Sequence, residues 1–160
     1  QYTEEEISAA VAAAENWGTY VAAHVYNSKG AQRAVKLGVK SIEHANLIDR
    51  ETMELMADNN VWLSPQVMIF EAELKGFTAD QQAKQKQARD GLHQLMTLAA
   101  AMDYRNIVFG EDIVTSLAGL NQINQELVLR SRWFTPVQIL RQATSRAGEL
   151  MALSGPRNPY

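Results

Sequence analysis

Short apolar runs alternate along the chain with longer stretches in which apolar positions recur every three or four residues. The short runs are typical of buried strands, and the longer periodicity is typical of helices that bury one face. The predicted strands are residues 19–25, 39–45, 61–66 and 106–112. Strands that alternate with helices form a parallel sheet with right-handed crossovers, so the sequence predicts an α/β fold.

The predicted helices carry start and stop signals. Thr3, Thr78 and Thr135 each precede a Glu or Gln by three residues, which is the pattern of a capping box. Asp49 is placed to cap a further helix, and Gly18 can take the left-handed conformation that ends the first one. These signals predict helices over residues 3–18, 28–38, 49–60, 78–103, 119–132 and 135–152.

Composition and charge narrow the classes of function. The chain has 160 residues, of which 46% are hydrophobic, enough for one compact domain with a core. Its net charge of -3 disfavours nucleic acid and anionic membranes as partners, and the absence of cysteine excludes disulfides and thiolate chemistry. No apolar run reaches the roughly 20 residues that span a bilayer, so we expect a soluble protein of undetermined compartment.

Two histidines and one aspartate fall at the carboxyl ends of predicted strands. His24 closes the first strand, His44 the second and Asp112 the fourth. Function gathers at this rim in parallel sheets, and these side chains ligate metals or move protons. Core histidines satisfied by hydrogen bonds are the alternative, and no H-E-x-x-H pair decides between the two. Arg130 and Arg132 could meet an acidic substrate group, although we expect them to be surface charges.

Four motifs carry a resemblance to a known superfamily: AAHVY, GVKSIEH, GED and TPVQILRQATSRAGEL. Together they resemble the C-terminal half of the barrel of the amidohydrolase superfamily, in its imidazolonepropionase-like and prolidase-like branch. The similarity spans nearly the whole chain. It implies a partial (β/α)8 TIM barrel, strands five to eight with their helices, as a single domain over residues 1–160.

The resemblance also implies a chemistry. His24 corresponds to the metal-ligating histidine of strand five, His44 to that of strand six, and Asp112 to the aspartate of strand eight, which binds metal and moves protons. The implied cofactor is a divalent metal, with zinc favoured, and a metal-activated water would hydrolyse carbon–nitrogen bonds in amides or dipeptides. Tyr26 could contact the substrate, with packing as the alternative. Glu111 stands where the family commonly has Thr or Ser.

Parts of the family's machinery are missing from the chain. No His-x-His pair occurs, and a complete barrel of this type needs roughly 250 residues or more. We therefore expect a fragment of a longer metal-dependent hydrolase that is inactive alone and whose metal site is weak or empty. A non-catalytic half-barrel that serves as a folding or assembly module is the alternative.

The open edges of a half-barrel predict a partner. The first and last strands would expose unpaired backbone groups and an apolar face. We expect either the missing N-terminal half of the barrel or a second copy of the chain, and hence a homo-oligomer, to cover them.

Overall fold

The computed structural model describes residues 2–71, 76–113 and 121–157. In chain order its elements are α1 (Glu4–Asn16), β1 (Ala22–Asn27), α2 (Ser28–Lys36), β2 (Ser41–Leu47), α3 (Arg50–Asp58), β3 (Trp62–Ser64), α4 (Met68–Glu71), α5 (Ala79–Ala101), α7 (Asn124–Arg130), α8 (Pro136–Ala143), α9 (Ser145–Met151) and the 3-10 stretch η1 (Ala152–Arg157). The three strands form a parallel sheet in the order β1-β2-β3, which confirms the predicted α/β alternation. No helix in these ranges is long and apolar enough to cross a membrane.

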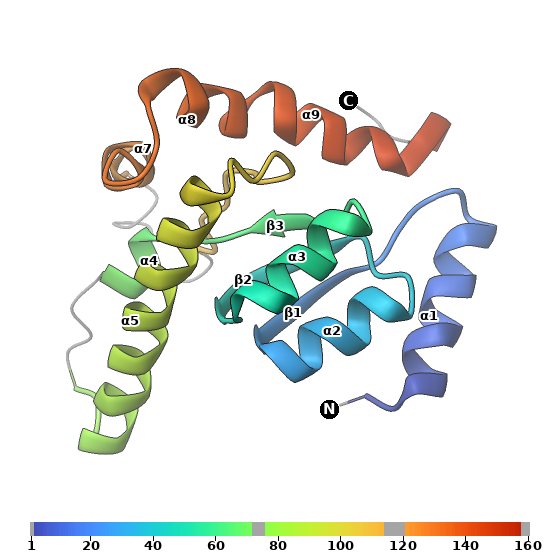
Figure 1. Ribbon diagram of the computed structural model, residues 1–160, viewed down its shortest axis with the longest axis horizontal. Helices are drawn as coiled ribbons and strands as arrows, with labels where there is room; N and C mark the ends of the chain where they lie inside the picture. Colours follow the sequence, from blue (N-terminus) through green and yellow to red (C-terminus); the bar gives the residue numbers. More distant parts are fainter. Residues whose placement is uncertain (1, 72–75, 114–120, 158–160) are drawn as a thin grey trace.

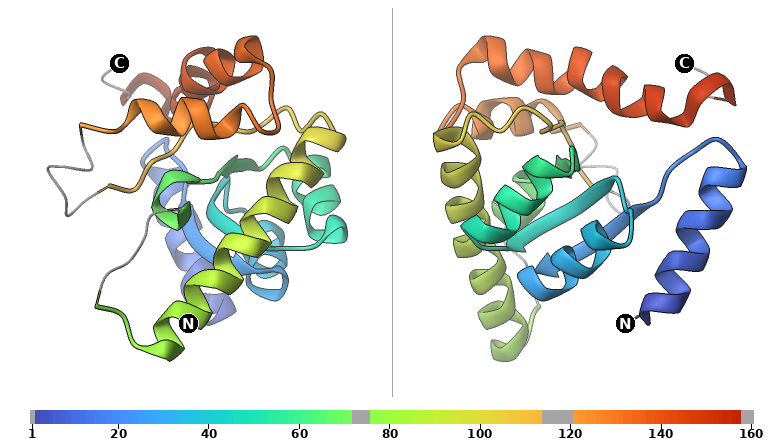
Figure 2. Two further views of the ribbon diagram at one scale, coloured as in Figure 1. Left: turned by 90° about the vertical axis from the view of Figure 1, so that its left-hand side faces the viewer. Right: turned by 45° about the vertical axis from the view of Figure 1, so that its right-hand side comes forward.

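The helices are arranged around the small sheet. Helices α2 and α3 lie side by side on one face, and α5 packs against β2 (Figure 1). Helices α8 and α9 form a long layer along one side of the molecule, while α1 and α5 lie at its opposite ends (Figure 2). Helix α5 approaches β2 closely because it carries Gly91, where a Cβ atom would stand 2.4 Å from the Asn46 carbonyl oxygen.

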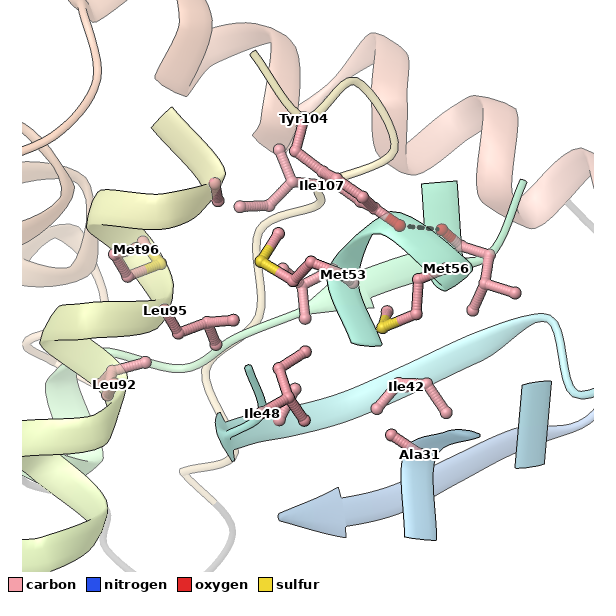
Figure 3. Packing of buried hydrophobic residues seen from close by; sticks show 14 of the residues in the cluster. Ala31, Ile42, Ile48, Met53, Met56, Leu92, Leu95, Met96, Tyr104 and Ile107 are labelled. Carbon is pink, nitrogen blue, oxygen red and sulfur yellow. Dashed lines mark hydrogen bonds between the residues drawn. The ribbon is translucent and has the colours of Figure 1, made fainter. Parts of the chain in front are cut away.

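The hydrophobic core lies between β2 and the helices α3 and α5. Ile42 of β2 lies with Met53 and Met56 of α3, and Leu92 and Leu95 of α5 close one side of the cluster (Figure 3). None of the five is more than 1% exposed. Burying each such side chain stabilises the fold by about 1.5–3 kcal/mol, so this packing holds β2 firmly between its neighbours.

The capping signals are confirmed. Capping boxes form at Thr3, Thr78 and Thr135, and the Asp49 side chain accepts a hydrogen bond from the first turn of α3. Strand boundaries are less well predicted. Strands β1 and β2 both begin and end later in the chain than predicted, and β3 is shorter because it ends before Pro65.

The predicted fourth strand, residues 106–112, is wrong in extent. Only one parallel bridge, between Leu63 and Ile107, joins it to the sheet. The next bond of a parallel ladder would run from the N–H of residue 65 to the Val108 carbonyl, but Pro65 has no N–H. An arginine side chain from α7 binds that carbonyl instead, at 3.0 Å. The chain therefore leaves the sheet after a single bridge.

Two of the predicted C-terminal helices also differ from the structure. The helix expected over residues 135–152 is divided at Thr144 into α8 and α9. The Gln142 carbonyl near the end of α8 accepts a hydrogen bond from Phe109 N–H at 3.1 Å. This bond ties the end of α8 to the segment just after the Leu63–Ile107 bridge. The helix expected over residues 119–132 corresponds to α7, which begins only at Asn124. Residues 121–123 form a turn, and 119 and 120 lie outside the described ranges.

Candidate functional site

The side chains of His24 in β1 and His44 in β2 meet on the face of the sheet opposite α2 and α3. His24 Nδ1 and His44 Nε2 lie 2.8 Å apart, at hydrogen-bond distance, and the ring centroids are 4.9 Å apart. His44 is only 4% exposed. Two ring nitrogens that face one another can share a proton or, when both lack one, ligate the same cation.

A local backbone turn brings the two rings together. Glu43 is the register partner of His24, so strand alternation alone would point His44 to the other face of the sheet. His44 and Ala45 instead have positive φ, 71° and 58°, and the β1–β2 register shifts just after Val25. A non-glycine residue in this region costs about 1–3 kcal/mol and persists where the surrounding structure imposes it, which is common at functional sites.

Asp112 lies beside this pair. Its Oδ2 is 3.9 Å from His44 Nε2, and its backbone also has a positive φ of 57°. The structure therefore brings together the three side chains that the sequence placed at one rim. Their position along the strands differs from the prediction, because β1 continues to Asn27 and β2 to Leu47, beyond the two histidines.

Aromatic side chains enclose His44. Tyr26 stacks on the His44 ring, with centroids 4.8 Å apart and an interplanar angle of 14°. Phe70 meets both rings edge-on, at 6.2 Å from His44 and 6.3 Å from Tyr26. Tyr26 belongs to β1 and not to the following loop, where the sequence placed it. Burial, and then the charge of Asp112, raises the pKa of Tyr26, so its hydroxyl stays protonated at neutral pH.

The surroundings of His44 favour the neutral imidazole. Burial lowers the pKa of His44, and the neighbouring His24 acts in the same direction, while the carboxylates of Asp112 and Glu43 oppose it. The net shift is downward. Neutral imidazole is the form that ligates metal ions, so this environment suits a ligand better than a cationic histidine.

The donor types fit a divalent metal, although the three side chains are not arranged as a finished ligand set. Two histidines and a carboxylate are the protein ligands of many zinc sites, at about 2.0–2.2 Å from the ion. Around a tetrahedral ion two such nitrogens stand about 3.3 Å apart, so the pair at 2.8 Å would have to open by about 0.5 Å. Within the described ranges no group of three or more ligand side chains is placed to hold a metal as it stands.

Arg130 is fully buried, which shows that the expected surface charge was wrong. Its Nε donates to Glu126 Oε1 at 2.7 Å, and both side chains are 0% exposed. Its remaining nitrogens donate to the carbonyls of Val108 and Pro65 and to the Gln142 side-chain oxygen. The guanidinium of Arg130 in α7 thus binds α8 through Gln142. It also binds two backbone segments, one at Pro65 just after β3 and one at Val108 just after Ile107.

The sequence held only a weak signal for this buried pair. Glu126 and Arg130 are spaced i, i+4, which normally indicates an ion pair on the exposed surface of a helix. Arg132 does fit the expectation of a surface charge, because it is partly exposed and donates to Glu71 at 2.8 Å. His93 also contacts Glu71, and its ring packs edge-on against Trp133, so it belongs to this surface cluster and not to the His24–His44 site.

Comparison with known proteins finds similarity over nearly the whole chain. The model of the amidohydrolase family matches residues 1–155. Among curated proteins, the ochratoxinase of Aspergillus niger is 26% identical over 151 residues, which cover 92% of this chain and 31% of the ochratoxinase. The chain therefore spans about a third of the length of that relative.

Solved structures give the same picture. A prolidase complexed with N-methylphosphonate-L-proline matches with a TM-score of 0.86 and 29% identity, over 97% of this chain and 38% of the prolidase. A Xaa-Pro dipeptidase with methionine bound in its active site matches with a TM-score of 0.82 and 27% identity, over 96% of this chain and 39% of the dipeptidase. The structure of the A. niger ochratoxinase matches with a TM-score of 0.84 and 26% identity, over 99% of this chain and 36% of that structure.

Proposed function

Because the chain belongs to the amidohydrolase family, we propose that it supplies part of the catalytic centre of a metal-dependent hydrolase that cleaves carbon–nitrogen bonds. The observation that carries the proposal is the contact of His24 with His44 beside Asp112, on the open face of the sheet. The names of similar proteins, prolidase and Xaa-Pro dipeptidase, support a substrate with an amide or dipeptide bond.

Each side chain of the site has a role in this proposal. His24 and His44 would hold a divalent ion, with zinc favoured, through the ring nitrogens that face each other, and Asp112 would be the third ligand. When bound, such an ion polarises a carbonyl group and lowers the pKa of water. Asp112 accepts a proton from the attacking water and returns it to the leaving nitrogen. Tyr26, stacked on His44, borders the space in which the substrate binds.

The proposed enzyme is longer than this chain. We propose that residues 1–160 form strands five to eight of a (β/α)8 barrel, and that the remaining ligands come from the part of the barrel not contained here. This is supported by the chain's spanning 36–39% of the structures it resembles. Alone, the chain has an incomplete metal site with few groups to orient its ligands. It should therefore be inactive.

Calorimetric titration with zinc tests the site in the isolated chain. Binding should be far weaker than the about 10–16 kcal/mol typical of structural zinc sites, because the ligand set is incomplete. His44→Ala should abolish the binding, whereas His93→Ala, which changes the surface cluster with Glu71, should leave it intact. Tight zinc binding together with amide hydrolysis by the isolated chain would contradict the proposed dependence on the missing part.

The alternative is that the chain serves as a half-barrel assembly module. It is favoured by one observation: β1 is an edge strand among the described strands, and its residues Ala22, His24 and Tyr26 are exposed on the open face. We propose that the rest of the barrel covers this edge in the enzyme, and a second copy does so when the chain is alone. Sedimentation equilibrium at micromolar concentration should show a dimer or larger species, and a stable monomer would count against the covering copy.

A further inference from the structure

Four buried side-chain atoms have no hydrogen-bond partner within the described ranges, the other two being oxygens of Asn46 and Glu111, and two of the four are chemically complementary. One is Nδ1 of His44 and the other is the side-chain oxygen Oε1 of Gln66. Both side chains are 4% exposed, so water does not easily satisfy them. A neutral imidazole carries one N–H, and an amide oxygen is an acceptor, so each atom can supply what the other lacks. A buried polar group left unpaired is costly.

The sheet register brings Gln66 close to His44. Glu43 of β2 pairs with Ser64 of β3, so His44 and Gln66 lie one and two residues after paired positions on neighbouring strands. The Gln66 side-chain nitrogen donates to the Ser64 carbonyl at 2.7 Å, which fixes the amide orientation and leaves its oxygen free.

The buried Glu126–Arg130 pair holds the backbone on both sides of Gln66. Arg130 donates to the Pro65 carbonyl just before it. The Glu126 carboxylate accepts from the Val67 N–H at 3.0 Å and from the Met68 N–H at 2.7 Å, just after it. The ion pair thus fixes the short segment that presents the Gln66 side chain, although none of its own atoms contacts a histidine of the site.

Space around the Gln66 amide is also restricted. A Cβ atom at Gly110 would lie 3.0 Å from the Gln66 side-chain nitrogen and 2.8 Å from the Ser64 hydroxyl oxygen. Gly110 precedes Asp112 by two residues, so the Gln66 amide packs directly against the segment that carries the third residue of the site. A glycine here lets the amide and this segment approach each other.

We propose that Gln66 is a positioning residue: its side-chain oxygen accepts the proton of His44 Nδ1 and so selects the tautomer whose bare Nε2 faces His24. In the metal-free chain His24 then carries its proton on Nδ1 and donates it to His44 Nε2, across the observed 2.8 Å contact. That this tautomer presents an unprotonated His44 Nε2 to a metal ion rests on the proposed function. The Glu126–Arg130 pair keeps Gln66 in position to accept the His44 proton.

Nitrogen-15 NMR of the histidine rings tests the assignment directly, because the chain has only three histidines. At a pH where the imidazoles are neutral, His44 of the wild-type chain should be protonated on Nδ1. Gln66→Leu removes the acceptor and should lower the ratio of the two His44 tautomers by about tenfold, since a single hydrogen bond is worth about that factor. The His93 signals, remote from the change, report whether the variant is folded.

Two results would overturn the assignment: a wild-type His44 protonated on Nε2, or a folded Gln66→Leu variant with an unchanged tautomer ratio. The first of these results is measured on the wild-type chain, so it decides the matter even if the variant fails to fold. Addition of zinc separates this inference from the proposed function. If His44 shows the expected tautomer but zinc leaves the His24 and His44 signals unchanged, the inference about Gln66 stands and the metal site does not.

Discussion

Replacement of Arg130 by methionine should lower the free energy of unfolding by about 3–5 kcal/mol, the usual cost of removing one partner from a buried ion pair. The variant leaves the Glu126 carboxylate buried without its charge partner, and it also frees the carbonyls of Val108 and Pro65 and the Gln142 side chain. A typical domain is stable by only 5–15 kcal/mol, so the variant should be close to unfolding. Urea denaturation followed by tryptophan fluorescence measures the change.

Arg132→Met is the matched control for this prediction. Arg132 is two residues away and also pairs with a carboxylate, that of Glu71, but its side chain is 46% exposed. Exposed ion pairs contribute about 0–1 kcal/mol, so this variant should lose no more than that. Equal losses in the two variants would mean that burial of the Glu126–Arg130 pair does not matter. A loss below 1 kcal/mol for Arg130→Met would mean that the pair does not hold the segment around Gln66.

In the complete enzyme, Asp112→Asn should lower kcat for amide hydrolysis by about 10²–10⁴-fold, the usual contribution of a positioned acid or base. The amide has the size of the carboxylate but cannot accept a proton from water. Asparagine also tolerates the left-handed backbone that Asp112 adopts, with φ 57°, so the fold should survive. Steady-state hydrolysis of an Xaa-Pro dipeptide by the longer protein, compared with the wild type, measures the loss.

Asp103→Asn is the control for the carboxylate itself. Asp103 also has a positive φ, 45°, but it lies in the exposed turn after α5, outside the proposed site. Its variant should keep wild-type activity. If Asp112→Asn loses less than tenfold, or if both variants lose activity equally, Asp112 is not the proton carrier.

The sequence predicted the elements whose signals are local. The capping boxes at Thr3, Thr78 and Thr135 need only the residues within one turn, and the alternation of strands and helices needs only hydrophobic periodicity. The gathering of His24, His44 and Asp112 followed from parallel topology and from the family resemblance, and the structure brings these side chains together.

Other features depend on contacts that no local pattern encodes. His44 and Ala45 adopt positive φ without a glycine, so tertiary packing and not residue preference sets the turn that brings the two histidines together. Pro65 was visible in the sequence, but its effect on the predicted strand 106–112 was not. That effect depends on which carbonyl, here that of Val108, would have accepted the N–H that proline lacks. The spacing of Glu126 and Arg130 is the same for a buried pair as for an exposed one.

The central claim, that His24, His44 and Asp112 form the metal centre, is tested most directly by locating a metal in crystals of the chain. Crystals soaked in millimolar zinc would be measured at the zinc absorption edge, where anomalous scattering identifies the ion. The account predicts that zinc at this millimolar concentration fills the weak site between His24 Nδ1, His44 Nε2 and Asp112. Zinc bound only at His93 and Glu71, or no zinc beside His44 while other sites on the chain are filled, would contradict it.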